Sequence, residues 1–194
     1  MHRKVRLRDE TLVVIRSMNR NDVDRSFAFF EYLSPEDRAY LRRDVSDRKV
    51  VEERIRAMKS GNVKRVVALV DDRIVADAAL EFDSLTWKKH VAEVRLIVAS
   101  AYQRKGLGML MARELYSIAT DANVEEIAVR MMRPQIAARS IFRKLGFHEE
   151  TVLPDYVKDL AGHKQDMILM RCDLQALWCE LEDFISTWDW QRTR

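Results

Sequence analysis

Residues 93–115 constrain the fold more than any other part of the chain. They begin as an extended, β-branched run, and from Leu107 apolar residues recur at helical spacing. Between the two halves, residues 103–108 (QRKGLG) form a turn with two glycines and two cations. A strand that feeds a glycine turn at the start of a helix presents free backbone N–H groups to an anion, and the helix dipole adds partial positive charge. The sequence therefore predicts a phosphate or pyrophosphate site at this turn.

Composition sets the outer bounds. A chain of 194 residues with 47% apolar and 34% charged residues is typical of one globular domain. The net charge of +3 gives no support for a nucleic-acid partner, and no apolar stretch approaches the length of a membrane span. Two cysteines and the lack of a secretory signal pattern favour a cytoplasmic protein without a disulfide framework. The basic N-terminal residues, of which Arg3 and Lys4 are the first, are expected to form a solvated tail.

Periodicity predicts an α/β chain without repeats or linkers. The expected strands cover residues 11–17, 63–70, 74–82, 91–98, 124–131, a stretch from 147, and 165–172. The expected helices cover residues 23–33, a short stretch from 34, residues 47–60, 107–118 and 135–145, and a segment from 174 onward. This order predicts a mainly antiparallel sheet that becomes parallel near the glycine turn.

Two motifs carry a family resemblance. The turn at residues 103–108 resembles the Gln/Arg-x-x-Gly-x-Gly/Ala signature of the GNAT superfamily of acyl-CoA-dependent N-acyltransferases. Residues 135–147 are similar to the family's second pattern, Asn-x-x-Ala-x-x-Leu-Tyr-x-Lys-x-Gly-Phe, and match it at Ala138, Lys144, Gly146 and Phe147. The flanking elements also follow the family order.

The resemblance implies a GNAT-type α/β (α+β) fold. Its mixed, mainly antiparallel sheet would be splayed at the acyl-CoA site and flanked by helices. Residues 1–173 would form the N-acetyltransferase domain, and residues 174–194 an additional C-terminal helix whose apolar stripe packs on the core or forms a homodimer contact. The implied activity is transfer of an acetyl group from acetyl-CoA to a primary amine of a small metabolite or a protein lysine, by direct attack in a ternary complex.

The same resemblance assigns site residues. The family places pantetheine along the strand before the turn and pyrophosphate on the turn itself. No metal is expected, because the four histidines lack metal-ligand spacing. The implied cofactor-binding residues are Leu96, Ile97, Val98, Gln103, Arg104, Lys105, Gly106, Leu107, Gly108, Met109, Gln135 and Phe142.

Two departures from the family pattern bear on the chemistry. Gln135 stands in the asparagine place, and Phe142 stands where many members carry a tyrosine that protonates the departing thiolate. Either the thiolate leaves without that acid, with water, Tyr156 or Ser140 as substitutes, or the protein is a non-catalytic acyl-CoA-binding module.

Glu93 is the candidate general base. An amine must lose a proton to attack a thioester, and some family members carry a glutamate base near this point of the strand. The alternative interpretation of Glu93 is a strand carboxylate paired with a neighbour such as Arg95. An oxyanion would be met by a backbone N–H of the strand, that of Ile97 or a neighbour.

Overall fold

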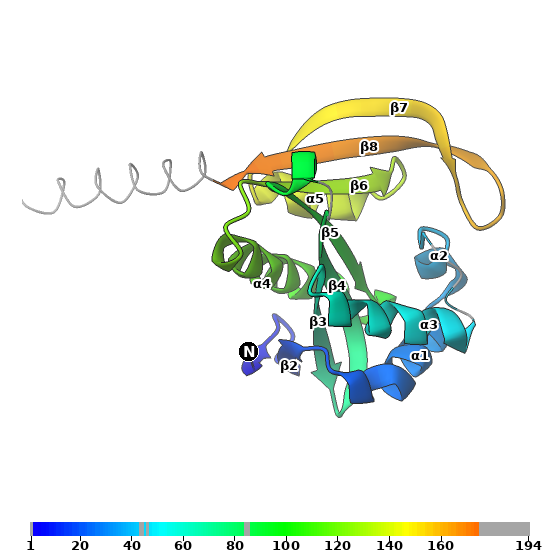
Figure 1. The fold of residues 1–194 in the computed structure, drawn as a ribbon. Helices are drawn as coiled ribbons and strands as arrows, with labels where there is room; N and C mark the ends of the chain where they lie inside the picture. Colours follow the sequence, from blue (N-terminus) through cyan, green and yellow to red (C-terminus); the bar gives the residue numbers. More distant parts are fainter. Residues whose placement is uncertain (1, 43–44, 46, 84–85, 175–194) are drawn as a thin grey trace, which may run out of the picture.

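The computed structural model describes residues 2–42, 45, 47–83 and 86–174 (Figure 1). Within these residues the strands are β1 (His2–Arg6), β2 (Leu12–Ser17), β3 (Val63–Val70), β4 (Arg73–Phe82), β5 (Val91–Val98), β6 (Glu126–Met132), β7 (His148–Lys158) and β8 (Lys164–Asp173). The α-helices are α1 (Val23–Tyr32), α2 (Pro35–Arg38), α3 (Arg48–Arg56), α4 (Leu107–Asp121) and α5 (Ile136–Lys144). The predicted C-terminal helix of residues 174–194 lies outside the described residues, apart from Leu174, which is buried.

The described strands form one sheet in the order β1-β2-β3-β4-β5-β6-β8-β7. Every neighbouring pair is antiparallel except β5 and β6, which run parallel. The connection between these two strands is α4, because parallel neighbours need a crossover. The predicted α/β fold with a mixed, mainly antiparallel sheet is therefore confirmed.

The expectation of a solvated N-terminal tail is wrong. Residues 2–6 form β1, which pairs antiparallel with β2 from His2↔Arg16 to Arg6↔Leu12. Its side chains are mostly exposed, so this basic stretch forms an edge strand. Charged side chains on an edge strand oppose pairing with other chains, which gives the basic residues a structural role.

Buried side chains pack in layers on both faces of the central strands. Figure 1 shows α4 on one side of these strands and α1 and α3 on the other. Leu107, Met111 and Leu115 of α4 belong to the core on one face, and helices α1 and α3 cover the other face. Neighbouring residues Val66 and Val67 of β3 belong to opposite layers, as strand geometry requires. Because both faces are covered, residues 66–70 of β3 appear in the sequence as a continuous apolar run.

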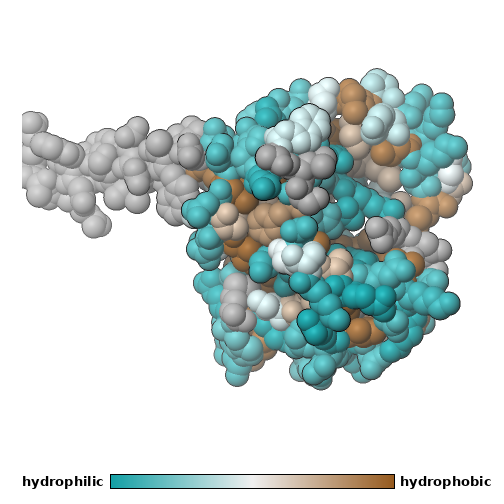
Figure 2. Space-filling model, viewed as in Figure 1, coloured by the Kyte–Doolittle hydropathy of each residue, from teal (hydrophilic) through white to brown (hydrophobic). Residues whose placement is uncertain are grey.

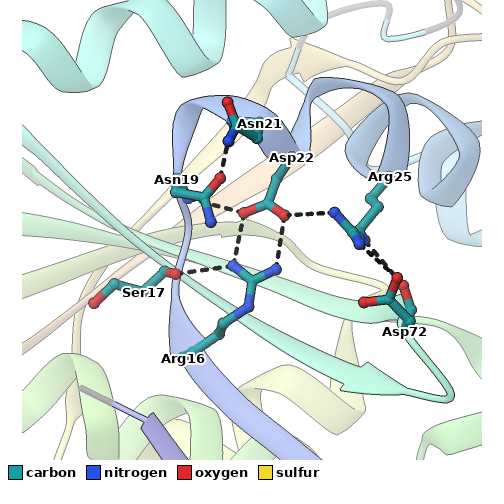
Figure 3. Close-up of polar contacts among 7 residues, drawn as sticks. All are labelled: Arg16, Ser17, Asn19, Asn21, Asp22, Arg25 and Asp72. Carbon is teal, nitrogen blue, oxygen red and sulfur yellow. Dashed lines mark hydrogen bonds and ion pairs between the residues drawn. The ribbon is translucent and has the colours of Figure 1, made fainter.

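Asp22 ties β2 to the start of α1 (Figure 3). Its carboxylate is fully buried and accepts hydrogen bonds of 2.6 and 2.7 Å from both terminal nitrogens of Arg16, and one of 2.8 Å from the Asn19 N–H. Arg25 forms an ion pair with Asp22 at 3.6 Å and also binds Asp72 in the β3–β4 turn. One carboxylate thus joins a strand and a helix directly and a hairpin through Arg25.

The environment of Asp22 makes stability depend on pH. Burial raises the pKa of Asp22, but the hydrogen bonds from Arg16 and Asn19 and the charges of Arg16 and Arg25 outweigh it, so the pKa lies below its ordinary value. A lowered pKa in the folded state stabilises the fold at pH above the unfolded value of about 3.9, and that stabilisation is lost as pH falls through the folded pKa.

We expect Asp22→Asn to lower the free energy of unfolding by about 3–5 kcal/mol, because it leaves the part-buried Arg16 guanidinium without its anion. The variant should also lose part of the steep decline in stability below about pH 4. Urea denaturation of both proteins between pH 3 and 7 measures both effects. Asp24→Asn is the control, since Asp24 is 81% exposed and its pair with Arg48 is expected to contribute less than about 1 kcal/mol. Equal losses in the two variants would contradict this account.

Candidate functional site

The sheet opens between β5 and β6. The parallel pairing runs from Val91↔Glu126 to Val94↔Val129 and then stops. By contrast, β5 stays paired with β4 as far as Val98, and β6 stays paired with β8 as far as Met132. Residues 95–98 of β5 and 130–132 of β6 therefore border an opening, which we call the β5–β6 gap. Figure 1 shows β6, β7 and β8 running across the direction of β3–β5. Strand edges without pairing offer main-chain groups to a ligand with amides.

The glycine turn lies at the far end of this open edge. Arg104 (φ 58°) and Gly106 (φ 92°) adopt left-handed backbone conformations, and α4 begins at Leu107. Gly106 provides no side-chain cap for the first turn of α4. An uncapped helix N-terminus has free N–H groups, which makes it suitable for an anion. The strand–turn–helix arrangement that the sequence predicts is confirmed.

The second glycine of the motif has a packing role. A Cβ atom at Gly108 would lie 2.9 Å from Cδ1 of Ile141 in α5. Because Gly108 has no side chain, α4 and α5 approach closely, and the two motifs that are separate in the sequence meet here. Gly106, by contrast, is required for its positive φ.

Polar side chains hold the turn in place. Gln103 donates hydrogen bonds from Nε2 to the Val98 carbonyl oxygen at 2.8 Å and to Oδ1 of Asp37 at 3.1 Å. Asp37, from α2, also accepts a hydrogen bond of 3.0 Å from the Ser100 N–H. Gln103 thus links the end of β5 to α2.

The two cations of the turn differ in their contacts. The Lys105 ammonium lies 2.8 Å from a carboxylate oxygen of Asp9, and the hydrogen bond from Lys105 is the largest factor that lowers the pKa of Asp9 to about 2. Arg104 is exposed and forms no ion pair with the residues that the structure describes. Arg104 is therefore the cation of the turn that is free to meet a ligand.

A cavity of about 380 Å³ extends from the β5–β6 gap towards α3. The space-filling view in Figure 2 is hollowed between the upper half of the molecule, with β7 and β8, and the lower half. One side of the cavity, the apolar wall, is lined by Val94, Leu96, Val129, Met131, Ala138 and Phe142. The other side, the charged wall, is lined by Arg54, Arg65, Asp77, Glu81 and Arg95.

Some of the predicted cofactor residues line this cavity, and others lie beside it. Leu96, Ile97, Gln135 and Phe142 line it, whereas Val98 and residues 103–109 of the turn do not. The Gln135 side chain accepts a hydrogen bond of 2.8 Å from the Met132 N–H, so its amide oxygen already stabilises the end of β6. Phe142 is 3% exposed and packs edge-to-face on Phe147, which explains why an apolar ring is stable at this position.

Glu93 lies at the β5–β6 boundary between two arginines. Its side chain is 17% exposed; one carboxylate oxygen forms an ion pair with Arg42, and the other lies 3.2 Å from Arg130. The pairing with Arg95 that the sequence suggests is not formed, because Arg95 binds Glu81 at 2.8 Å. Glu93 is not among the lining residues of the cavity, although both of its arginine partners are.

Sequence reasoning missed the charged wall. Its members come from α3, β3, β4 and β5, and only the sheet register brings them together. One signal was available: Arg65 and Asp77 are charged residues inside apolar strand runs, where burial makes a charge costly unless it has a partner or a function. Tyr40 also lines the cavity and was not singled out, whereas Tyr156 is 64% exposed on β7 and Ser140 does not line the cavity.

Among the described residues, no helix is both long and apolar enough to cross a bilayer.

Comparison with solved structures finds the same fold in acetyltransferases. Ribosomal-protein-S5-alanine acetyltransferase from Vibrio fischeri superposes with a TM-score of 0.76 at 14% identity, over 89% of this chain and 96% of that one. The yncA protein of Salmonella typhimurium, solved with its cofactor acetyl-CoA, gives 0.73 at 17% identity, over 84% and 94%. A GNAT-family acetyltransferase from Streptococcus pneumoniae gives 0.72 at 19%, over 82% and 98%.

At the level of sequence, no curated protein matches the chain. The family model described as the acetyltransferase (GNAT) family matches residues 26–147, which include the β5–β6 gap, the glycine turn and α5. These findings favour an enzyme over a non-catalytic binding module. The chain belongs to the GNAT family of acetyltransferases and is an acyltransferase.

Proposed function

We propose that this protein transfers the acetyl group of acetyl-CoA to a primary amine by direct attack in a ternary complex. The observation that carries the proposal is the open edge of β5, which leads from the cavity directly to the uncapped N-terminus of α4. In coenzyme A the pantetheine arm contains two amides and is joined to a pyrophosphate, so the cofactor is complementary to a free strand edge followed by an anion site.

The cofactor would then follow the order of the chain. Its pyrophosphate binds the backbone N–H groups of residues 106–109, with Arg104 adding charge. Its pantetheine arm pairs with residues 96–98, and the thioester lies near the apolar wall beside Phe142. Because α5 contacts α4 at Gly108, these two helices, which would border the cofactor, are fixed relative to each other.

The reaction requires one proton acceptor. The lone pair of the amine attacks the thioester carbonyl carbon, the tetrahedral intermediate collapses with cleavage of the C–S bond, and the amine proton must leave. In the proposal Glu93, which lies between Arg42 and Arg130, accepts that proton through water. A backbone N–H of β5 near Ile97 stabilises the oxyanion.

The leaving thiolate needs little help. A thiol has a pKa of about 8.5, so CoA thiolate is a moderate leaving group at neutral pH even though Phe142 has no proton to donate. Solvent or the Tyr40 hydroxyl at the cavity lining then supplies the final proton. The acceptor is an amine of a small molecule or of a protein.

We expect isothermal titration calorimetry to detect acetyl-CoA binding by the wild type and at least a ~100-fold loss in Gly106→Glu. The substitution strains a residue at φ 92° and adds a carboxylate where the pyrophosphate binds. Gly162→Glu is the matched control, since Gly162 has φ 86° and open space around it in the β7–β8 turn. Equal affinity in the two variants would place the cofactor elsewhere.

We expect Glu93→Gln to lower kcat by about 10²- to 10⁴-fold at neutral pH, because the amine loses its proton acceptor. The deficit should shrink as pH rises and more of the amine is already neutral, and the KM for acetyl-CoA should stay within a few fold. Thiol release measured from pH 6 to 10 tests this. Glu126→Gln, which removes the partner of Arg171 on the neighbouring strand, is the control. A deficit that is constant with pH would assign Glu93 a structural role.

A further inference from the structure

The charged wall is organised by the register of three strands. Arg65 of β3 lies opposite Ala79 of β4, and Ala79 lies opposite Arg95 of β5. The methyl group of Ala79 thus separates two guanidinium-bearing residues on one face of the sheet. Arg54 reaches the same region from α3, with its guanidinium carbon 4.4 Å from the centre of the Phe30 ring. Three arginines therefore converge on one end of the cavity.

The carboxylates of the charged wall do not satisfy these arginines. Asp77 lies 3.0 Å from Arg65 and 3.5 Å from Arg54, and Glu81 lies 2.8 Å from Arg95. One buried nitrogen on each arginine has no hydrogen-bond partner among the described residues: Nη1 of Arg54, Nε of Arg65 and Nε of Arg95. A buried N–H without a partner costs about 1–3 kcal/mol, more when it is charged.

Two of these arginines are well removed from solvent, and the third, Arg95, is 35% exposed. The Arg65 side chain is 4% exposed and that of Arg54 is 17% exposed. Burial lowers the pKa of Arg54 to about 10 and also lowers the pKa of Arg95, despite the opposing carboxylates. The charged wall therefore holds positive charge that the protein only partly compensates.

The neighbouring charges do not remove this excess. Arg42 and Arg130, which also line the cavity, share the single carboxylate of Glu93, and Glu53 adds one further carboxylate to the lining. The set thus contains more guanidinium groups than carboxylates. A network that served only to fix α3 on the sheet would use its buried N–H groups within the protein.

We propose that the charged wall binds an anionic group of the acceptor, so that the substrate is an amine that also carries a carboxylate. This rests on the proposed function, because it assigns the acceptor to the end of the cavity that the cofactor leaves free. A carboxylate accepts two parallel hydrogen bonds from a guanidinium group, and Arg95, which is 35% exposed and lines the cavity, is placed to donate to it while Arg54 and Arg65 add positive charge behind it. Binding there holds the amine towards the thioester at the apolar wall.

The test compares acceptors that differ only in the anion. Thiol release is measured with glycine, β-alanine and γ-aminobutyrate, with their carboxamides, and with 2-aminoethylphosphonate. We expect each carboxylate to exceed its carboxamide in kcat/KM by about 10- to 100-fold. The amine of the carboxamide is the less basic one and is more often neutral, so intrinsic reactivity favours the opposite order. A phosphonate that exceeds every carboxylate would reassign the site to phosphate-type anions and overturn the carboxylate proposal.

Substitutions of Arg95 test whether the charged wall causes the preference for acceptors that carry a carboxylate. Arg95→Gln should reduce the carboxylate preference to within a few fold of unity, and Arg95→Lys should restore part of it. Arg171→Gln is the control, because Arg171 is comparably exposed (39% against 35% for Arg95) and ion-paired on β8. Arg95 is substituted rather than Arg65, because a change at the more deeply buried Arg65 is expected to disturb folding. Thermal unfolding of each variant checks that it is folded.

The outcomes separate the two proposals. Acetylation of carboxylates and carboxamides at equal rates would overturn the anion site and leave the amine acetyltransferase standing. Acetyl-CoA binding without acetylation of any amine in the panel would overturn both. A carboxylate preference that survives Arg95→Gln would assign the recognition to other residues.

Discussion

The pairing between β5 and β6 stops after Val94↔Val129, and the rest of the site depends on this interruption. Had the parallel ladder continued to Val98, β6 would satisfy the edge of β5, and neither the cavity nor the open strand edge that leads to the glycine turn would exist. The two halves of the sheet are joined by the β5–β6 pairs from Val91↔Glu126 to Val94↔Val129, and beyond that point β4 and β8 still pair with the outer edges of the two strands. The opening is thus bordered by rigid strands, which keeps the geometry of a long cofactor fixed.

Two buried charge clusters in this chain have opposite characters. Around Asp22 both carboxylate oxygens are bonded, and the residues involved connect β2, α1 and the β3–β4 turn, so this cluster stabilises the fold. Along the charged wall, three arginines that are 4–35% exposed each keep one N–H group without a partner among the described residues, and they border a cavity. Because unsatisfied buried groups are costly, each one that a protein retains calls for an explanation, such as a functional role or a bound molecule that completes the set. The contrast between the clusters distinguishes a structural role from binding.

Local patterns determined how much could be predicted from the sequence. The strands at 63–70 and 91–98 have the predicted bounds, because β-branched runs between turn residues are clear signals. The glycine turn could also be predicted, because its glycines and cations are adjacent in the sequence. The edge strand β1 was missed because its basic residues lack an apolar pattern. It is a strand because it pairs with β2, and this pairing is not visible in the local sequence. The charged wall could not be predicted, since Arg54, Arg65 and Arg95 become neighbours only through strand register and the packing of α3.

The central claim is that the open edge of β5 and the start of α4 form one continuous site for acetyl-CoA. Amide hydrogen exchange, followed residue by residue with and without saturating acetyl-CoA, tests it directly. We expect slower exchange on binding for the amides of residues 95–98 that face the β5–β6 gap and for those of residues 107–109, with no change along β1. Saturable binding that leaves both segments unprotected would contradict it.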